Sequence, residues 1–251
     1  MKTRLVHGRL DVKYHVVDGR DLISNTLRRQ GVYEAEVLEA TAAALQSFAT
    51  RTEDVRGRVL DVGANIGTYA LPLAKTYPAL ELVCFEPQLP VCDLLRKNVE
   101  LNQLHNVVTH ALGLSDSAGE VTVTLPDYNL EPNIGAFSLD PEVQIHEYEV
   151  KTRGVTQTVQ LRTLDSFDFH EVRLLKVDVE GLELAVLRGG QQTLAKNGFP
   201  PILFEAWTWK PWYAPRRGEL IAWVEALGYR VQGFGAFNNL ARHPASRRMP
   251  R

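Results

Sequence analysis

The sequence predicts an α/β fold, a doubly wound and mainly parallel seven-stranded sheet with helices on both faces. Short apolar runs alternate with longer helical patterns along most of the 251 residues, as in sheets whose parallel strands are joined by helices. One run, Arg58–Val62, meets the loop GANIG and continues as a helix, a junction that marks the ligand end of such a sheet. The length fits one domain with a sizeable core.

The individual elements follow from the spacing of apolar residues. Residues 1–30 contain short β-like pieces over 10–17 and a turn at 18–20. The predicted helices, each with an apolar stripe, cover 35–48, 68–77, 90–102, 182–194 and 217–227. The predicted strands, each an apolar run between turn residues, cover 59–62, 80–85, 106–112, 121–125, 157–161, 172–179, 201–205, 230–232 and 239–242. We therefore expect a single domain over 1–251, with an N-terminal cap (1–50), a core (58–235) and a β-hairpin or lid insertion (126–154).

The loop after the first core strand predicts a nucleoside site. Gly63 and Gly67 let the backbone approach a ligand, because glycine has no Cβ. The second strand ends on Glu86, nineteen positions after Gly67, where a carboxylate can accept two hydrogen bonds from a ribose. An ordinary strand–turn–helix with a surface glutamate is the simpler alternative. The joint presence of the loop and the acid favours the nucleoside site.

The same loop favours S-adenosylmethionine over a dinucleotide. It lacks the G-x-G-x-x-G pattern and fits D-x-G-x-N-x-G, with Asp61 ahead of the loop. An acid there suits the ammonium group of S-adenosylmethionine and suits a pyrophosphate badly. Asn65 replaces the middle glycine, a mild change because asparagine tolerates left-handed backbone angles. The predicted cofactor contacts are Asp61, Gly63, Ala64, Asn65, Ile66, Gly67, Thr68, Glu86, Pro87, Leu112 and Asp178.

Five segments together resemble the FkbM family of S-adenosylmethionine-dependent methyltransferases. These segments are DVGANIGTYAL, FEP, LNQLHNV, ALGLSDSAGEV and LLKVDVEGLELAVLRGG, in this order, and the likeness runs from about Gly31 to about Tyr229. The resemblance implies a Rossmann-like class I methyltransferase fold and, most often in this family, methylation of an oxygen. It also implies that Tyr33 and Glu34, in GVYE, lie near the cofactor, although a helix start with its acid at the favourable end explains them equally well.

Charged residues near the end of a buried strand are the candidate catalytic groups. Lys176 and Asp178 lie two positions apart and so share a face, and Glu180 continues it. A structural Lys–Asp pair is the alternative, but the strand end is where acceptor and cofactor should meet. Glu205, at the end of the next strand, is a fourth candidate. Because Lys176 should keep Asp178 ionised, Glu180 is the predicted base.

Two further segments are candidates for the acceptor site. We interpret the long polar segment 126–154 as a lid over the acceptor, with Asn133, Gly135 and Ser138 as its contacts, although a surface insertion fits equally well. The tryptophans after the strand 201–205 can line an acceptor pocket or simply pack. No His/Cys spacing of a metal site is present, so no metal is predicted.

Composition limits the partners and the compartment. A net charge of −2 gives no reason to expect nucleic acid, and no apolar stretch reaches the ~20 residues of a membrane span. Two cysteines in apolar segments and no signal-peptide core favour the cytoplasm. We expect a small-molecule acceptor and leave a homo-oligomer open. The alternatives to O-methylation are N-methylation on the same fold, a nucleotide-dependent oxidoreductase and a binding module without catalysis.

Overall fold

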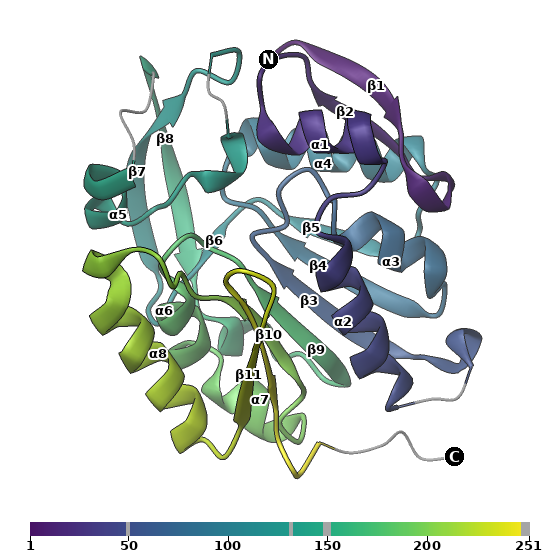
Figure 1. Ribbon diagram of the computed structural model, residues 1–251, viewed down its shortest axis with the longest axis vertical. Coiled ribbons are helices and arrows are strands. Elements are labelled where there is room, and N and C mark those ends of the chain that lie inside the picture. The colour runs from purple at the N-terminus through teal and green to yellow at the C-terminus, as the bar shows by residue number, and fades with distance from the viewer. Residues whose placement is uncertain (49–50, 131–132, 148–151, 247–251) are drawn as a thin grey trace.

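A central parallel sheet organises the computed structural model, which describes residues 1–48, 51–130, 133–147 and 152–246 (Figure 1). Within these residues, seven strands pair in the order β11-β12-β10-β9-β3-β4-β5. The strands from β10 to β5 are parallel, and β12 is antiparallel to both of its neighbours. Their bounds are β3 (Gly57–Val62), β4 (Leu80–Phe85), β5 (Val107–His110), β9 (Val172–Val177), β10 (Ile202–Glu205), β11 (Arg230–Phe234) and β12 (Asn238–Arg242). The predicted fold class is confirmed.

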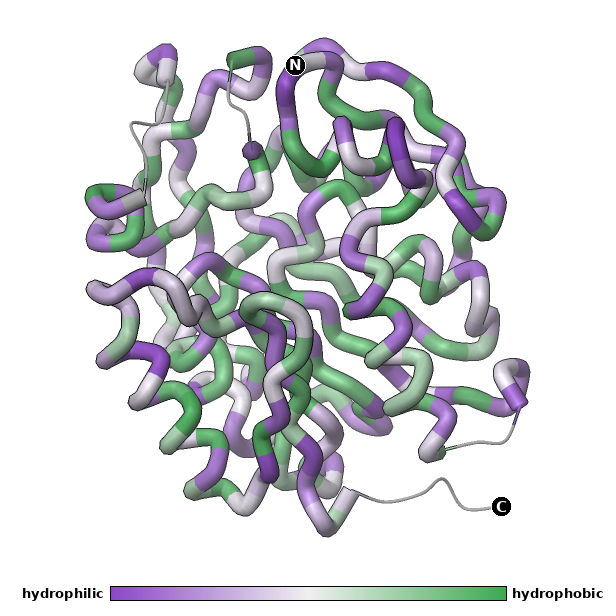
Figure 2. Tube along the Cα trace, in the orientation of Figure 1, coloured by the Kyte–Doolittle hydropathy of each residue, from purple (hydrophilic) through white to green (hydrophobic). Residues whose placement is uncertain are grey.

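Helices cover both faces of this sheet. One face packs against α1 (Leu22–Gln30), α2 (Ala35–Gln46), α3 (Ala70–Thr76) and α4 (Leu89–Leu101), and the other against α6 (Glu183–Arg188), α7 (Gln191–Lys196) and α8 (Ala214–Ala226). Val59 belongs to the first core and Leu60 to the second, because successive strand residues point to opposite faces. Both faces are buried, and Figure 2 accordingly shows hydrophobic residues running through the central strands.

Two smaller β-structures flank the sheet. β1 (Thr3–His7) and β2 (Lys13–Val17) form an antiparallel hairpin in the N-terminal cap. β7 (Gly119–Pro126) and β8 (Thr152–Arg162) pair antiparallel on either side of the insertion, and β6 (Gly113–Leu114) joins β8. The predicted strand 106–112 is therefore too long, because β5 pairs with β4 only as far as His110 and the chain then crosses to the smaller sheet.

The insertion itself is partly helical. It contains a 3-10 turn at Ile134–Ala136 and the helix α5 (Pro141–Glu147). Arg216 on α8 forms ion pairs with Asp140, 2.5 Å away, and with Glu142, so the insertion is tied to the core. Other parts of the predicted 126–154 lid lie outside the described residues. None of the helices described here is long and apolar enough to cross a membrane.

The prediction of one helix over 182–194 was wrong, because Gly189 and Gly190 separate two helices, α6 and α7. A Cβ on Gly189 would lie 2.0 Å from the carbonyl oxygen of Ser115, so the chain passes too close to that loop for any side chain. α7 then starts afresh, with the carboxylate of Asp165 accepting hydrogen bonds from the backbone N–H groups of Gln192 and Thr193. The apolar period alone does not reveal such a break.

The sequence analysis missed α1, although its end signals are present. Asp21 accepts a hydrogen bond from Ser24 N at 2.8 Å and so caps the helix N-terminus. Gly31 follows the last helical residue with a φ of +71°, the left-handed conformation typical of a residue that ends a helix. Both signals fall in a segment that is polar on average, with Leu22, Ile23 and Leu27 as its apolar residues, and α1 lies beside the functional site described below.

Candidate active site

A cavity of about 310 Å³ opens at the carboxyl ends of β3, β4, β9 and β10. Its walls come from the loop after β3, from Glu86, from the turn after β9 and from Glu205. Most residues predicted from the sequence line it: Gly63, Ala64, Asn65, Thr68, Glu86, Pro87, Leu112, Lys176, Asp178, Glu180 and Glu205. Asp61, Ile66 and Gly67 do not appear among the lining residues and support the site from behind.

The loop after β3 is held by close backbone contact. A Cβ on Gly63 would lie 1.8 Å from the carbonyl oxygen of Asp178, so the ends of β3 and β9 meet only because Gly63 has no side chain. Asn65 has a φ of +48°, the left-handed conformation that the sequence analysis expected. Its side-chain Oδ1 accepts a hydrogen bond from Ile66 N at 2.7 Å. The loop therefore keeps a fixed shape toward the cavity.

Glu86 faces this loop as a buried, preorganised carboxylate. Its Oε2 accepts from Asn65 N at 3.0 Å, and its Oε1 accepts from Gln88 N at 2.9 Å. Burial raises the pKa of Glu86 to about 7, against the opposing effect of these backbone N–H groups. Each oxygen keeps a further lone pair, so the carboxylate can still accept hydrogen bonds from a ligand diol.

Lys176 joins two strands by ion pairs beneath the cavity. Its Nζ lies 3.3 Å from Asp61 Oδ1 on β3 and 3.1 Å from Asp178 Oδ2. Burial disfavours the charged ammonium, but Asp178, Asp61 and Glu34 outweigh burial and hold the pKa of Lys176 well above its ordinary value. Lys176 thus stays charged and orients Asp178, as the shared strand face predicted. Asp61 is fully buried and serves Lys176 rather than the cavity.

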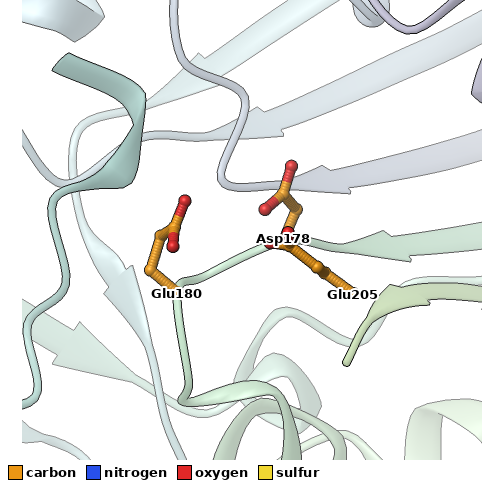
Figure 3. A group of neighbouring side chains, drawn as sticks. All are labelled: Asp178, Glu180 and Glu205. Atoms are coloured by element: carbon orange, nitrogen blue, oxygen red, sulfur yellow. The ribbon is translucent and has the colours of Figure 1, made fainter. Parts of the chain in front are cut away.

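Three carboxylates meet at the other end of the cavity (Figure 3). Asp178, Glu180 and Glu205 each place one oxygen within 4.8 Å of the others, from the ends of β9 and β10. Burial, followed by the charge of Asp178, raises the pKa values of both Glu180 and Glu205 well above the ordinary range for glutamate. Such oxygens can share protons, and they are also of the type that a divalent cation takes. A group made of carboxylates alone has no His/Cys spacing, so that pattern in the sequence does not reveal it.

The turn that carries Glu180 is shaped by a residue outside the cavity. Glu180 has a φ of +54° and is followed by Gly181 at +101°. The Oε1 atom of Glu183 accepts hydrogen bonds from Val179 N at 3.2 Å and Gly181 N at 3.1 Å, and Tyr213 donates to its Oε2. Glu183 is therefore a support for the turn that carries Glu180.

The N-terminal cap contributes Tyr33 and Glu34 to the cavity wall. Glu34 has a φ of +49°, an uncommon conformation for a residue other than glycine, and such conformations concentrate at functional sites. Burial and the charge of Asp178 raise the pKa of Glu34 to about 7, while Lys176 lowers it. Both side chains thus line the same cavity as Glu86 and Asp178.

An aromatic wall closes the cavity beside the carboxylates. Trp207, Trp209 and Phe237 line it, whereas Trp212 and Tyr213 do not. Lys210 Nζ lies 3.3 Å from the centre of the Trp207 ring, a cation–π contact inside the lining. Of the tryptophans that follow β10, Trp207 and Trp209 therefore line the pocket, and Trp212 does not.

The insertion lines the cavity through Asn133, Gly135, Ala136, Phe137 and Leu139. Asn133 and Gly135, two of the three residues predicted to contact the acceptor, therefore lie in the cavity wall. The third, Ser138, is buried and holds the insertion together instead, because its Oγ accepts a hydrogen bond from Asp140 N at 3.0 Å.

Comparisons with known proteins identify the family. Residues 61–231 match the profile described as a methyltransferase FkbM domain. Methyltransferase sdnD from Sordaria araneosa is 32% identical over 204 residues, which cover 69% of this chain and 73% of that protein. The 2-O-methyltransferase NoeI from Sinorhizobium fredii is 26% identical over 148 residues, covering 56% and 60%. The hexuronic acid methyltransferase AglP from Haloferax volcanii is 28% identical over 143 residues, covering 55% and 52%.

The matched region coincides with the site. It begins at Asp61 and includes the loop after β3, Glu86, the three carboxylates, Trp207 and Trp209, and it spans more than half of the chain. The cap residues Tyr33 and Glu34 lie outside it. The chain therefore belongs to the FkbM methyltransferase family.

Proposed function

We propose that this chain transfers the methyl group of S-adenosylmethionine to a hydroxyl group of a small molecule, a sugar or a natural product. The observation that carries the proposal is one continuous cavity with a nucleoside-type carboxylate, Glu86, in its wall and with Asp178, Glu180 and Glu205 also lining it. The names of two relatives support a hydroxyl and a sugar, since one is a 2-O-methyltransferase and the other acts on a hexuronic acid.

The residues present fit S-adenosylmethionine. Glu86 is buried and preorganised by Asn65 N and Gln88 N, with lone pairs left for a ribose diol. Gly63 leaves no side chain between the ligand and the strand ends. The acidic groups Asp178 and Glu34 suit a ligand with a sulfonium and an ammonium, and they would repel the pyrophosphate of a dinucleotide.

The chain's own groups account for the rest of the reaction. When bound, S-adenosylmethionine supplies an electrophilic methyl group on a positively charged sulfur. The aromatic wall and the carboxylates orient the acceptor hydroxyl in line with that methyl group. Glu180 takes the hydroxyl proton, and its raised pKa makes the ionised form a stronger proton acceptor than an exposed glutamate. Lys176 pairs with Asp178 and holds its carboxylate in position.

N-methylation is the second candidate, and a specific observation favours it. Three carboxylates within 4.8 Å of one another, in a cavity that Trp207 and Trp209 also line, make a suitable environment for a substrate ammonium group. The same base would then deprotonate the amine before transfer. Matched acceptor pairs that differ only in a hydroxyl or an amino group distinguish the two reactions.

Calorimetric titration is the first test of the proposal. S-adenosylmethionine and its product S-adenosylhomocysteine should bind, whereas NAD should not. Binding of NAD with neither of the other two would replace the proposal with an oxidoreductase. Tight S-adenosylmethionine binding without methylation in a wide panel of alcohols and amines would instead indicate a binding module.

A further inference from the structure

The insertion crosses the nucleoside end of the cavity. Gly135 lies against Asn65, because a Cβ on Gly135 would come 2.9 Å from Asn65 Nδ2. Leu139 lies against Gly113, because a Cβ on Gly113 would come 3.0 Å from Leu139 Cδ1. Asn65 follows β3 and Gly113 follows β5, and β4 lies between these two strands. Residues 133–139 therefore span the end of β4, where Glu86 is found.

The peptide groups flanking Ile134 are held from two sides. Its N–H donates to Asp21 Oδ1 at 3.1 Å, and its C=O accepts from Gln88 Nε2 at 3.5 Å. Gln88 is itself fixed, since Tyr128 donates to its side-chain oxygen and its own N–H donates to Glu86. The insertion is thus joined to the cofactor carboxylate on one side and to the N-terminal cap on the other.

Asp21 is a buried carboxylate whose donors are well defined. Its Oδ2 accepts from Ser24 N at 2.8 Å and from Ser24 Oγ at 2.6 Å, and its Oδ1 accepts from Ile134 N. A fully buried carboxyl group needs such bonds, because an unsatisfied polar group in the interior is costly. Asp21 therefore determines where the insertion sits, although it lies outside the matched region 61–231.

We infer that residues 133–139 form a roof over the nucleoside of S-adenosylmethionine and that Asp21 is a positioning residue that holds this roof closed. The inference rests on the proposed function, because it assigns the roof to that cofactor. Ala136 and Phe137 present apolar and aromatic surface to the cavity, and Asn133 presents an amide, a combination that suits a purine ring. Because the roof is already ordered before the ligand binds, binding does not require the loss of conformational entropy that ordering this segment would cost.

The variant Asp21→Asn tests this role. Asparagine remains a good helix N-cap, so it can keep the bond from Ser24 N, but its amide group then faces Ile134 N–H, donor against donor. We expect S-adenosylhomocysteine to bind about tenfold more weakly by calorimetry, or weaker still. Hydrogen exchange over residues 133–139, slowed by S-adenosylhomocysteine in the parent, should stay fast in the variant.

Two control variants distinguish the effect of Asp21 on the roof from its effect as the N-cap of α1. Asp18→Asn makes the same chemical change three residues away, at an acid paired with Arg4 on the surface, and should leave affinity unchanged. Ser24→Ala removes one of the Asp21 bonds within α1 but leaves Ile134 N–H bonded, so it should lower thermal stability without affecting ligand affinity.

The outcomes distinguish this inference from the proposed function. Parent-like affinity of Asp21→Asn, or equal weakening by Ser24→Ala, would overturn the roof and its positioning residue while leaving S-adenosylmethionine binding intact. Failure of the parent protein itself to bind S-adenosylhomocysteine would overturn the proposed function, and the roof with it.

Discussion

The two ends of the cavity handle buried acids in opposite ways. At the nucleoside end a single carboxylate, Glu86, has one backbone N–H donating to each oxygen. At the acceptor end Asp178, Glu180 and Glu205 crowd together, and Lys176 pairs with Asp178 alone among these three. The hydrogen bonds that hold Glu86 are already formed before a ligand binds. The repulsion among the three crowded carboxylates, in contrast, falls when a ligand with a positive charge or with hydrogen-bond donors enters. Under the proposed function, the nucleoside end is therefore arranged for one ligand, and we expect the acceptor end to select the substrate.

The largest effect should come from the acceptor end. Glu180→Gln removes the proposed base and should lower turnover by about 100-fold or more. Cofactor affinity should stay nearly unchanged, because Glu86 and its loop are untouched. Single-turnover methylation beside calorimetry measures both quantities. Normal turnover in this variant would move the base to Asp178 or Glu205 and weaken the contrast between the two ends.

Asp178→Asn should fail differently, because Asp178 contacts both Lys176 and the other two carboxylates. We expect losses in both cofactor affinity and turnover. If only turnover falls in the same two assays, Asp178 belongs to the acceptor end alone.

The nucleoside end should show the converse pattern. Glu86→Ala should weaken S-adenosylmethionine binding by roughly 1–3 kcal/mol, the range for hydrogen bonds to a charged group. Glu81→Ala is the matched control on the same strand, because Glu81 forms only a partly exposed ion pair with Arg58. Calorimetry that finds equal affinities for the two variants would show that the nucleoside lies elsewhere.

A smaller effect should appear in stability as a function of pH. Burial raises the pKa of Glu183 to about 7 in the folded protein, from a reference value of 4.5. An acid with a raised folded pKa stabilises the protein below pH 4.5, and this contribution is lost as pH rises toward 7 and above. Glu183→Gln should therefore reduce the fall in unfolding free energy between pH 5.5 and 8 by about 2 kcal/mol. Urea unfolding at both pH values measures it, and an unchanged fall would show that Glu183 is not a source of this pH dependence.

The smallest effect should come from the ion pairs that tie α5 to α8. Arg216 is partly exposed, and its bonds to Asp140 and Glu142 compete with water and salt. Arg216→Ala should change the free energy of unfolding by less than about 1 kcal/mol. A loss of several kcal/mol in urea unfolding would show that the insertion is fixed from the acceptor side as well as through Asp21.

Local patterns in the sequence predict the nucleoside end better than the acceptor end. The loop, Asn65 and Glu86 lie within one strand–loop–helix–strand unit, so spacing alone places them together. Asp178 and Glu205 could be placed at neighbouring strand ends for the same reason. Spacing in the sequence does not show how deeply a side chain is buried. Asp61 was therefore predicted as a ligand contact, although it lies behind the cavity wall beside Lys176.

Contacts distant in sequence account for most of what was missed. The bond from Ile134 N to Asp21 joins residues 113 positions apart, and no periodic pattern signals it. The split between α6 and α7 depends on Ser115, in a different loop. The cap signals of α1 were readable, but the segment is polar on average and did not stand out as a helix that packs on the core.

The ion pair between Asp61 and Lys176 has a consequence for how the sheet assembles. These two residues are direct partners in the parallel ladder between β3 and β9, and both are buried. A slip of one residue between the strands would turn the two charges to opposite faces and leave Asp61 buried without a counter-ion, at a cost of several kcal/mol. Leucine and valine neighbours would tolerate that misalignment far better. The salt bridge thus favours the correct register between β3 and β9, and this register brings Gly63 against the carbonyl group of Asp178.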